Sequence, residues 1–536
     1  MKIIYIALLT IALAGLSSCD LDLLEDPNNL TPDAASTDFV LNSIEFGLNE
    51  YFAELTELTM EITRMIAANP RGATYDTYWQ PQDFDDSWEQ AYTGILSDCQ
   101  NLISLAEEQG LTTHAGIART IQAYTIMTLV DIYGDVPWTE ALDPNNLNPS
   151  LDGGAAVYAT AESLLDAATE NFRSTSLGIP ANDLFYNGNS GQWLQLVNTL
   201  KLRLYVSTRL VDGSAAGKIN ALIQENNFIT PASDWDFPFS NNSSTTPSSQ
   251  HPFYVDNYGA ASDYMSNSYM NLLLRDKSIT DPRTRYYFYR QTLEISTDVN
   301  ELPCIVRNKP SHYTDDMVYC NAGDGYWGRD HIDVDGIPPD NLLRTIYGLY
   351  PVGGLFDADQ GAGATTSSGA LGAGVHPLMH SDWVDFMLAE SALTIGTNGD
   401  PRAFLENGVR GSIDKVMNFI PSQVDPAFAP TMDDVESYVA AVLDRYDNAP
   451  DDDGKLEVIM KEYYIALFGN GFESYNNYRR TGKPVNAQLP LNPQPGSFAR
   501  SFPYPSNFIN RNSNVSSKGT VAVPVFWDNN PADFVD

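Results

Sequence analysis

The sequence predicts a mainly α-helical fold, in which helical hairpins stack against one another and carry an irregular, loop-rich insertion. Apolar residues recur at helical spacing through residues 36–227 and again through 381–482. Between them, residues 228–380 contain stretches rich in Ser, Thr and Gly that bury little apolar surface. Loops of this length in a compact protein are usually functional or mobile. We therefore expect a helical scaffold in two parts that carries an irregular insertion between them.

The chain begins with a segment typical of a bacterial lipoprotein signal. Lys2 precedes an uncharged apolar run over residues 3–16, which is shorter than the roughly 20 residues needed to span a bilayer. The run ends in Leu-Ser-Ser-Cys, which resembles a lipobox, where cleavage precedes an acylated cysteine. We predict a signal peptide over residues 1–18, lipidation at Cys19 and an acidic tether over residues 19–35. An ordinary secretory signal with a chance cysteine is the alternative.

The first part of the scaffold shows the apolar periodicity of amphipathic helices. In the segments 161–172 and 193–204, apolar residues recur three, four, seven and eleven positions after the first. A weaker version of this pattern covers 118–132 and ends before Gly134. Further helices are expected near residues 36–67, 84–109 and 215–226.

The same periodicity returns in the second part of the scaffold, at 456–467. The motif NNYRRTGKP at 476–484 is typical of a helix end, because Gly suits the position after the last turn and Pro prevents continuation. We therefore predict one helix from near Lys455 to Gly482. Other helices are expected near 383–395, 402–420 and 433–446, followed by a C-terminal extension over 483–536, so that residues 36–536 form a single domain.

The charge balance argues against polyanionic partners. The chain has 30 basic and 69 acidic residues, a net charge of −39. Such a surface repels phosphate backbones, so we expect no nucleic-acid partner, and acidic polysaccharides are disfavoured relative to neutral ones. Adaptation to a saline habitat is an alternative explanation for the charge. The 29 Tyr and 8 Trp side chains offer flat faces for a ligand as well as for a core.

Three cysteines follow Cys19. Cys304 and Cys320 flank a loop-like segment and are the candidate disulfide, which the loop-entropy model values at about 3 kcal/mol. Cys99 lies in a helical pattern and is expected to be a buried thiol.

Two motifs in the insertion suggest cofactors and fail on inspection. GDGYWG at 323–328 matches a dinucleotide fingerprint, but the Asp, Gly and Pro residues after it forbid the helix that the fingerprint requires. HIDVDG at 331–336 resembles half of a calcium loop, but the twelfth position is Leu342 instead of Glu. An irregular calcium site is a weak alternative to a structural turn there, with candidate ligands Asp330, Asp333 and Asp335.

No catalytic motif is evident in the sequence. GxSxG, P-loop and HExxH patterns are all missing, and carboxylate pairs among so many acids decide nothing. We therefore predict a protein that is not an enzyme and needs no cofactor.

Several segments together resemble the SusD/RagB family of nutrient-binding outer-membrane lipoproteins, in particular its SusD-like, starch-binding-associated branch. The matches occur in order over nearly the whole mature chain. They are the lipobox at Cys19, DPNNLTP, DIYGDVPWTEAL at 131–142, DPRTRYYF at 281–288, GIPPDN at 336–341, YRRTGKP at 478–484, FPYPSNFIN at 502–510 and FWDNN at 526–530.

This resemblance implies TPR-like helical hairpins, an irregular ligand-binding face and a SusC-like TonB-dependent outer-membrane transporter as partner. It also implies a lipid-anchored protein of the outer membrane, and the acidic stretch after Cys19 resembles the one that sends related lipoproteins to the cell exterior. Ligands in this family are most often oligosaccharides and less often peptides. The leading hypothesis is therefore capture of a neutral glycan for import, with a peptide ligand as the alternative and a surface glycoside hydrolase as a less favoured one.

Two stretches combine aromatic and polar residues outside convincing helical patterns. Arg71, Tyr75, Tyr78 and Trp79 lie between two early helices and are candidates for a ligand-stacking platform. Tyr326 and Trp327 lie among glycines that would let a ligand approach closely. The alternative is that these rings pack their own loops.

Overall fold

The computed structural model describes residues 36–535, apart from 68–71, 144, 246–247, 261–262, 336–339 and 486. The predicted signal peptide, Cys19, the tether and Arg71 therefore lie outside the described residues. Over the part of the chain that is described, no helix is both long and apolar enough to cross a membrane.

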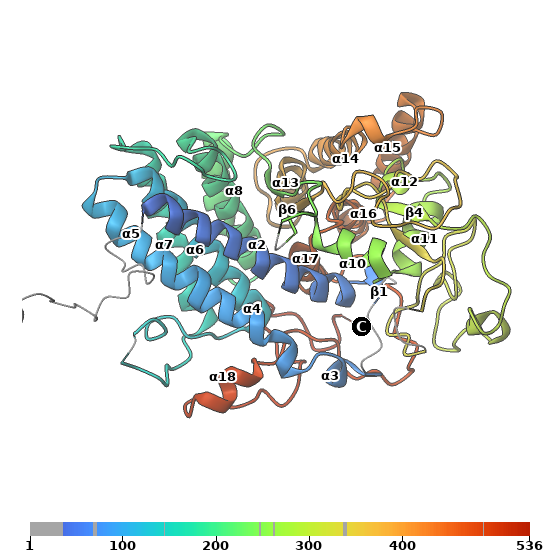
Figure 1. Ribbon diagram of the computed structural model, residues 1–536, viewed down its shortest axis with the longest axis horizontal. Helices are drawn as coiled ribbons and strands as arrows, with labels where there is room; N and C mark the ends of the chain where they lie inside the picture. Colours follow the sequence, from blue (N-terminus) through green and yellow to red (C-terminus); the bar gives the residue numbers. More distant parts are fainter. Residues whose placement is uncertain are drawn as a thin grey trace, which may run out of the picture.

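The N-terminal part of the scaffold is a set of long helices in which neighbours along the chain pack together (Figure 1). The central helix α6 is buried on nearly all sides, with α5 and α7 packed against it. This arrangement confirms the predicted mainly α-helical fold. The elements are α2 (Thr37–Ile62), β1 (Ile66–Ala67), α3 (Tyr75–Tyr78), η2 (Pro81–Phe84), α4 (Asp85–Glu89), η3 (Gln90–Leu96), α5 (Ser97–Glu108), α6 (Thr112–Tyr133), α7 (Gly154–Arg173), α8 (Ser190–Thr208) and α9 (Ala215–Glu225).

The C-terminal part of the scaffold forms the second group of helices (Figure 1). Its elements are α13 (Ser381–Ile395), α14 (Pro401–Met417), η5 (Pro421–Gln423), α15 (Met432–Asp447), α16 (Asp452–Ala466) and α17 (Gly471–Thr481). The C-terminal extension adds α18 (Ser506–Arg511), which packs against η2 and α4 of the N-terminal part.

The single helix predicted from Lys455 to Gly482 is wrong, because the chain breaks between α16 and α17. Gly469 has a φ of +101°, which is left-handed backbone that a helix does not contain. Asn470 then caps α17 by accepting a hydrogen bond from the Glu473 backbone. The predicted end at Gly482 is confirmed, with a φ of +65°.

The insertion is better ordered than its composition suggests. Three short antiparallel strand pairs, β1–β3, β2–β6 and β4–β5, hold it together and join it to the scaffold. Its helices bury several aromatic side chains, whereas its Gly- and Ser-rich stretches are irregular. The elements are β2 (Trp235–Pro238), α10 (Pro252–Ala260), β3 (Tyr264–Met265), α11 (Asn267–Arg275), α12 (Thr284–Tyr287), β4 (Phe288–Arg290), η4 (Pro303–Val306), β5 (Thr345–Tyr347) and β6 (Val375–Met379).

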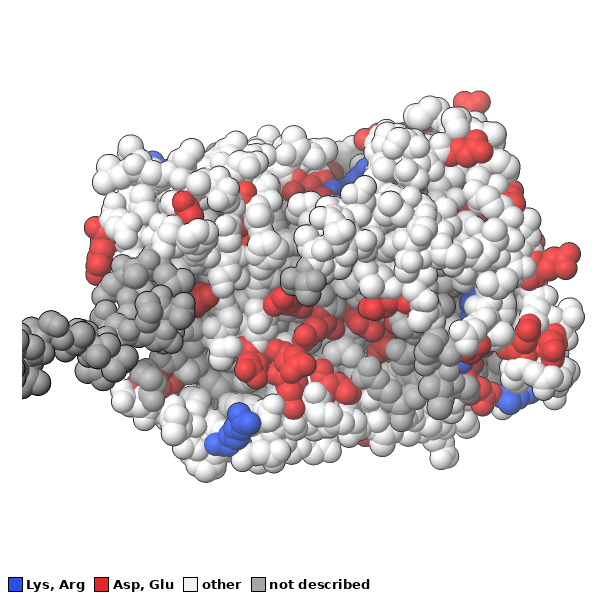
Figure 2. Space-filling model, in the orientation of Figure 1, with Lys and Arg blue, Asp and Glu red and all other residues white. Residues whose placement is uncertain are grey.

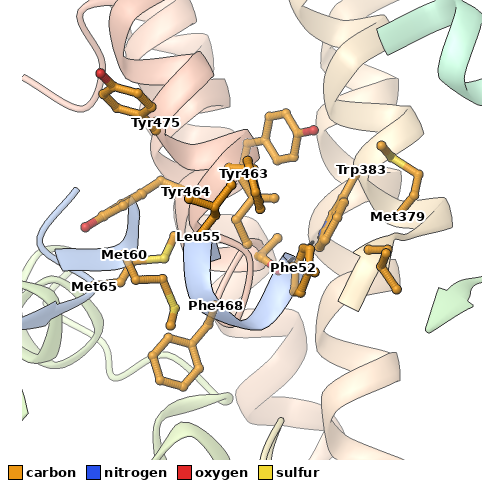
Figure 3. Packing of buried hydrophobic residues seen from close by; sticks show 14 of the residues in the cluster. Phe52, Leu55, Met60, Met65, Met379, Trp383, Tyr463, Tyr464, Phe468 and Tyr475 are labelled. Atoms are coloured by element: carbon orange, nitrogen blue, oxygen red, sulfur yellow. Dashed lines mark hydrogen bonds between the residues drawn. The ribbon is translucent and has the colours of Figure 1, made fainter. Parts of the chain in front are cut away.

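Helix α2 connects the two parts of the scaffold. It packs on α5 and α6 at one side and on α17 at the other. Phe52 and Leu55 of α2 meet Tyr463 and Phe468 in a continuous apolar core (Figure 3). The contact with α17 is so close that a Cβ on Gly471 would lie 2.4 Å from the Met60 backbone nitrogen, so only glycine fits there.

Acidic side chains gather at the centre of the face in Figure 2, over the region where α2 and α4 lie in Figure 1. Glu50 and Glu54 of α2 and Asp86 of α4 are exposed. Partial burial and the neighbouring carboxylates of Asp86 and Glu50 raise the pKa of Glu54 to about 7. This face would repel a polyanion.

A buried network around Asp131 ties the helices together. Its carboxylate accepts hydrogen bonds from Arg203 of α8 at 2.6 Å, Asn476 of α17 at 2.9 Å and the Trp527 ring at 2.9 Å, as well as from Tyr158. The Asp131 side chain is fully buried. A buried charge is tolerated only when it is paired and fully hydrogen-bonded, as it is here.

Removing this carboxylate should be strongly destabilising. We expect Asp131→Ala to lower the free energy of unfolding by about 3–5 kcal/mol, because Arg203 loses a buried counter-ion and several donors lose their acceptor. Urea unfolding followed by circular dichroism measures the change. Asp447→Ala is the matched control, since Asp447 also pairs with an arginine (Arg402, 2.7 Å) but at an exposed site. Equal effects of the two substitutions would contradict the role of the network.

A second buried carboxyl, Glu45 of α2, should make stability depend on pH. Burial, followed by the neighbouring charge of Asp183, raises the pKa of Glu45 from 4.5 to about 9. The unfolded chain ionises this group near pH 4.5 while the folded chain keeps its proton, so wild-type stability falls as pH rises from 4.5 to about 9.

Glu45→Gln mimics the protonated side chain and should remove this loss of stability at high pH. At pH 8 we expect the variant to exceed the wild type by at least about 1 kcal/mol in free energy of unfolding, and the difference to shrink towards pH 5. Denaturant titrations at several pH values test this, with exposed Glu108→Gln as control. A difference that does not change with pH would be evidence against a protonated Glu45.

Candidate functional site

The first predicted aromatic platform lies inside the core. Tyr75, Tyr78 and Trp79 are at most 1% exposed. The Tyr75 ring packs against Phe498, and the Trp79 ring packs edge-on against Phe502 with 5.5 Å between centroids. These partners belong to the C-terminal extension, which covers the segment. The prediction that these three rings form a ligand-stacking surface is therefore not supported.

The second predicted platform is covered as well. Tyr326 is 4% and Trp327 2% exposed. The Arg290 guanidinium lies 4.6 Å from the centre of the Tyr326 ring, and Trp327 packs beside the Cys304–Cys320 disulfide. A Cβ on Gly328 would lie 1.9 Å from a backbone oxygen of β3, so that glycine allows close backbone packing and not the approach of a ligand.

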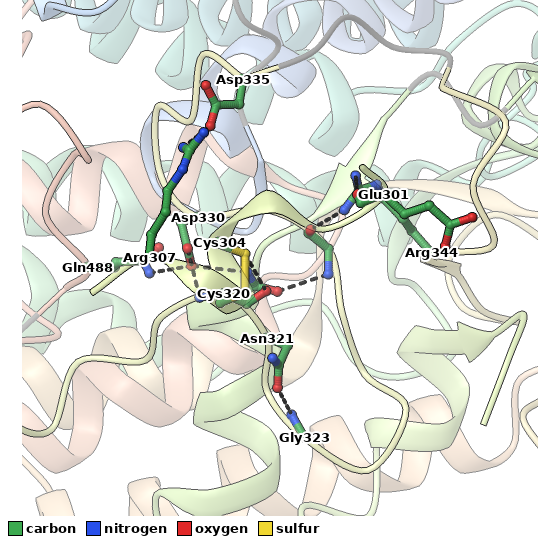
Figure 4. Close-up of a disulfide and its surroundings, with 12 residues drawn as sticks. Glu301, Cys304, Arg307, Cys320, Asn321, Gly323, Asp330, Asp335, Arg344 and Gln488 are labelled. Atoms are coloured by element: carbon green, nitrogen blue, oxygen red, sulfur yellow. Dashed lines mark hydrogen bonds and ion pairs between the residues drawn. A yellow bond between two sulfur atoms is a disulfide. The ribbon is translucent and has the colours of Figure 1, made fainter. Parts of the chain in front are cut away.

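The three candidate calcium ligands do not form a metal site. Asp330 accepts hydrogen bonds from Asn267, Gln488 and the Cys320 backbone at 2.8–3.0 Å, which occupies both of its oxygens (Figure 4). Asp335 pairs instead with Arg307. Within the described residues, no three His, Cys, Asp or Glu side chains are grouped to hold a metal ion.

Cys304 and Cys320 form a disulfide that closes a 16-residue separation (Figure 4). Its Cα atoms are 5.5 Å apart, within the usual range for a disulfide. The Cys99 thiol is free and buried.

A cavity of about 460 Å³ is the best candidate for a binding site. It opens between α11, α16, α17 and the start of the C-terminal extension. Its volume lies within the range of roughly 300–1,000 Å³ that is typical of small-molecule sites. Tyr269, Tyr464 and Tyr478 contribute aromatic surface to its wall.

Two polar side chains of α17 line this cavity with unused hydrogen-bonding capacity. Ser474 and Asn477 are 2% and 5% exposed, and neither the Ser474 hydroxyl nor the Asn477 Nδ2 has a hydrogen-bond partner. The two residues are three positions apart and so lie on one face of the helix. The Asn477 Oδ1 accepts from Arg480 at 2.6 Å, which fixes the direction of the amide. Buried polar groups without partners are rare, and a ligand with hydroxyl or carbonyl groups would satisfy them.

Three of the cations on the cavity wall, Arg275, Lys461 and Lys483, have acidic partners. Lys461 pairs with Asp276 at 3.3 Å and Glu457 at 3.1 Å, and Lys483 pairs with Asp453 at 2.8 Å. The local charge is therefore largely compensated, which favours a polar, uncharged ligand over an ionic one.

The sequence analysis missed Ser474 and Asn477 because it treated their motif as a helix end. One signal was available in retrospect: every residue of α17 is buried, although FESYNNYRR is too polar for an ordinary core helix. A polar helix in a buried place must satisfy its side chains internally or through a ligand.

Truncation of Trp79 should reveal a core residue. We expect Trp79→Ala to lower the free energy of unfolding by about 3–5 kcal/mol through the cavity that it leaves. Half-buried Trp138→Ala, the control, should cost clearly less. A Trp79 variant that unfolds like the wild type but loses affinity for a ligand would restore the platform hypothesis.

Comparison with known families matches two segments of the chain. A family described as "Starch-binding associating with outer membrane" (SusD-like) matches residues 27–305, more than half of the chain. A second, "Susd and RagB outer membrane lipoprotein", matches residues 371–523. A search of curated proteins finds no significant match.

Solved structures share the whole fold at low sequence identity. A SusD homologue from Bacteroides fragilis aligns with a TM-score of 0.68 and 16% identity, covering 93% of this chain and 100% of its own. A SusD/RagB family protein from Bacteroides thetaiotaomicron gives 0.67 and 18%, with coverages of 93% and 100%. A chitin-binding SusD homologue from Flavobacterium johnsoniae gives 0.65 and 16%, with coverages of 92% and 100%. The predicted family is thus confirmed, and the chain belongs to the SusD/RagB family of outer-membrane lipoproteins.

Proposed function

We propose that this protein captures a neutral oligosaccharide at the cell surface and delivers it to a SusC-like TonB-dependent transporter. The observation that carries the proposal is the cavity beside α17, with the unpartnered Ser474 hydroxyl and Asn477 amide on its wall. Family membership supports a binding role without catalysis, and a structural neighbour is described as chitin-binding. Cys19 would hold the protein to the outer membrane by its lipid, with the tether spacing the domain outwards.

The cavity chemistry suits a sugar. Tyr464 and Tyr478 line the cavity, each 8% exposed, and the exposed part of each side chain offers apolar surface to the C–H face of a pyranose ring. The Ser474 hydroxyl both donates and accepts a hydrogen bond, and the Asn477 Nδ2 donates one. Sugar hydroxyls also donate and accept, so they complement both groups.

A neutral ligand is favoured over a charged one in this cavity. Lys461 and Lys483 would have to give up their carboxylate partners to bind an anion. The overall charge of −39 adds long-range repulsion of an anionic ligand. A peptide is the alternative ligand, because its backbone carbonyls and amides could also satisfy Ser474 and Asn477.

Ser474→Ala tests the proposal cleanly. The hydroxyl has no hydrogen-bond partner among the described residues, so its removal should leave the free energy of unfolding unchanged. A lost hydrogen bond of about 0.5–1.5 kcal/mol would weaken oligosaccharide binding by up to about tenfold. Calorimetric titration with chitin and malto-oligosaccharides measures this change. Ser437→Ala, on the exposed face of α15, serves as the control.

The same titrations separate the alternatives. Saturable binding of intact sugars that Ser474→Ala weakens supports capture. Shortened sugar chains after incubation would instead indicate a hydrolase. Binding of short peptides but of no saccharide would show that the ligand is a peptide and not a glycan. Sugar binding unaffected by Ser474→Ala would place the site elsewhere.

A further inference from the structure

A second, smaller pocket lies beside the disulfide, on the insertion. Its volume is about 210 Å³, and its wall includes Cys304, Cys320 and the arginines Arg307, Arg329 and Arg344 (Figure 4 shows the disulfide, Arg307 and Arg344). The Asp330–Gln488 hydrogen bond, at 2.8 Å, separates it from the larger cavity, because Gln488 lines one and Asp330 the other.

Arg329 is a buried cation that forms no ion pair with any carboxylate of the described residues. The residue is 4% exposed and its guanidinium lies 4.7 Å from the centre of the Tyr264 ring. Its one hydrogen bond to a described residue runs from Nη1 to the Asp333 backbone oxygen at 3.4 Å, and Nε has no partner. No described carboxylate forms an ion pair with it, although carboxylates lie around the pocket.

Most of those carboxylates are engaged elsewhere. Asp333 is the exception, because Arg329 is near enough to oppose the rise in the pKa of Asp333 that burial causes. Asp340 pairs with Arg344 at 2.9 Å, and Asp335 pairs with Arg307. Asp330 accepts three hydrogen bonds from other groups, and Asp333 accepts one from the Asp335 backbone at 2.9 Å. Of the three arginines on the wall, only Arg329 forms no ion pair with a carboxylate in the described structure.

An uncompensated buried guanidinium is costly, and the cost falls when an anion binds to it. Cation–π contact with one tyrosine recovers only a small part of the lost hydration. A carboxylate accepts two parallel hydrogen bonds from a guanidinium edge, which is the strongest pairing available to arginine. The pocket volume restricts the ligand to a small molecule or to one residue of a longer one.

We propose that this pocket binds the carboxylate of a small ligand through Arg329. The carboxylate could belong to a sugar acid or to a free organic acid, and both present the same group to the guanidinium. This site is separate from the cavity that we assign to neutral sugars, and the two proposals can fail independently.

The test uses the purified protein and three probes: glucuronate, acetate and glucose. Calorimetric titrations and melting curves are recorded at constant ionic strength, which is balanced with NaCl. Glucuronate should bind saturably and raise the melting temperature, because a ligand that binds only the folded state stabilises it. Glucose should not compete for this site. Binding of both acids would show that the carboxylate alone suffices, whereas binding of glucuronate alone would identify a sugar acid.

Arg329→Gln should weaken glucuronate binding by about tenfold or more, whereas Arg329→Lys should retain part of it, because the charge remains but the fork of donors is lost. Arg402→Gln removes one exposed positive charge on α14 and is the matched control. Without added acid, Arg329→Gln should melt no lower than the wild type, because an unpaired buried charge is removed.

Three results would overturn the proposal. They are wild-type melting curves that respond to glucuronate no more than to NaCl, equal competition by glucose, and full binding by Arg329→Gln. If Arg329→Gln does not fold, the wild-type response and the Arg329→Lys variant still decide between binding and no binding. In every case Ser474→Ala, tested with neutral sugars, reports on the other cavity.

Discussion

The fold depends most on one buried carboxylate, that of Asp131. Arg203, Asn476, Trp527 and Tyr158 all donate hydrogen bonds to it, and they come from α8, α17, the C-terminal extension and α7. Such a network is stable only when every member is satisfied, so these four segments must be placed together. Two of the motifs that carried the family resemblance, DIYGDVPWTEAL and FWDNN, meet at this point, where they supply Asp131 and Trp527. Their sequence similarity therefore has a physical cause in the interior of the protein.

The same network prepares the binding cavity. Asn476 and Arg479 of α17 face inwards, where Arg479 donates to the Arg500 backbone at 2.7 Å. Ser474 and Asn477 lie on the cavity side of the same helix. Because α17 is fixed by its inner face, its outer polar groups are held in one direction before a ligand arrives. A pre-organised site loses less conformational entropy on binding than a mobile one.

The local sequence pattern predicted the helices, but it missed the features that depend on residues distant in the sequence. Apolar periodicity placed α7 and α8, and glycine chemistry placed the end of α17, because both are properties of a few consecutive residues. The break was readable in Gly469-Asn470-Gly471, which is a turn signal, but the apolar residues on either side were interpreted as one continuous helix. The aromatic stretch around Trp79 looked like a surface because Phe502, which covers it, lies more than 400 residues later in the chain. The role of Ser474 was beyond sequence reasoning, because a missing hydrogen-bond partner exists only in the folded structure.

Three of the buried polar groups that have no described partner lie where the insertion meets the C-terminal extension, and others occur throughout the described structure. Ser474, Asn477 and Arg329 all lie at cavity walls in this region, on either side of the Gln488–Asp330 hydrogen bond. Other buried charges, such as the carboxylate of Asp131, have several hydrogen-bond donors, whereas Arg209 and Asp382 also keep buried atoms without a described partner. Buried polar groups without a hydrogen-bond partner lower the stability of the fold. The groups beside the two cavities are therefore retained at a cost in stability. On the functions proposed above, ligands that bind to these groups would offset that cost, and the strands and the disulfide that anchor the insertion would keep the walls of both cavities in shape.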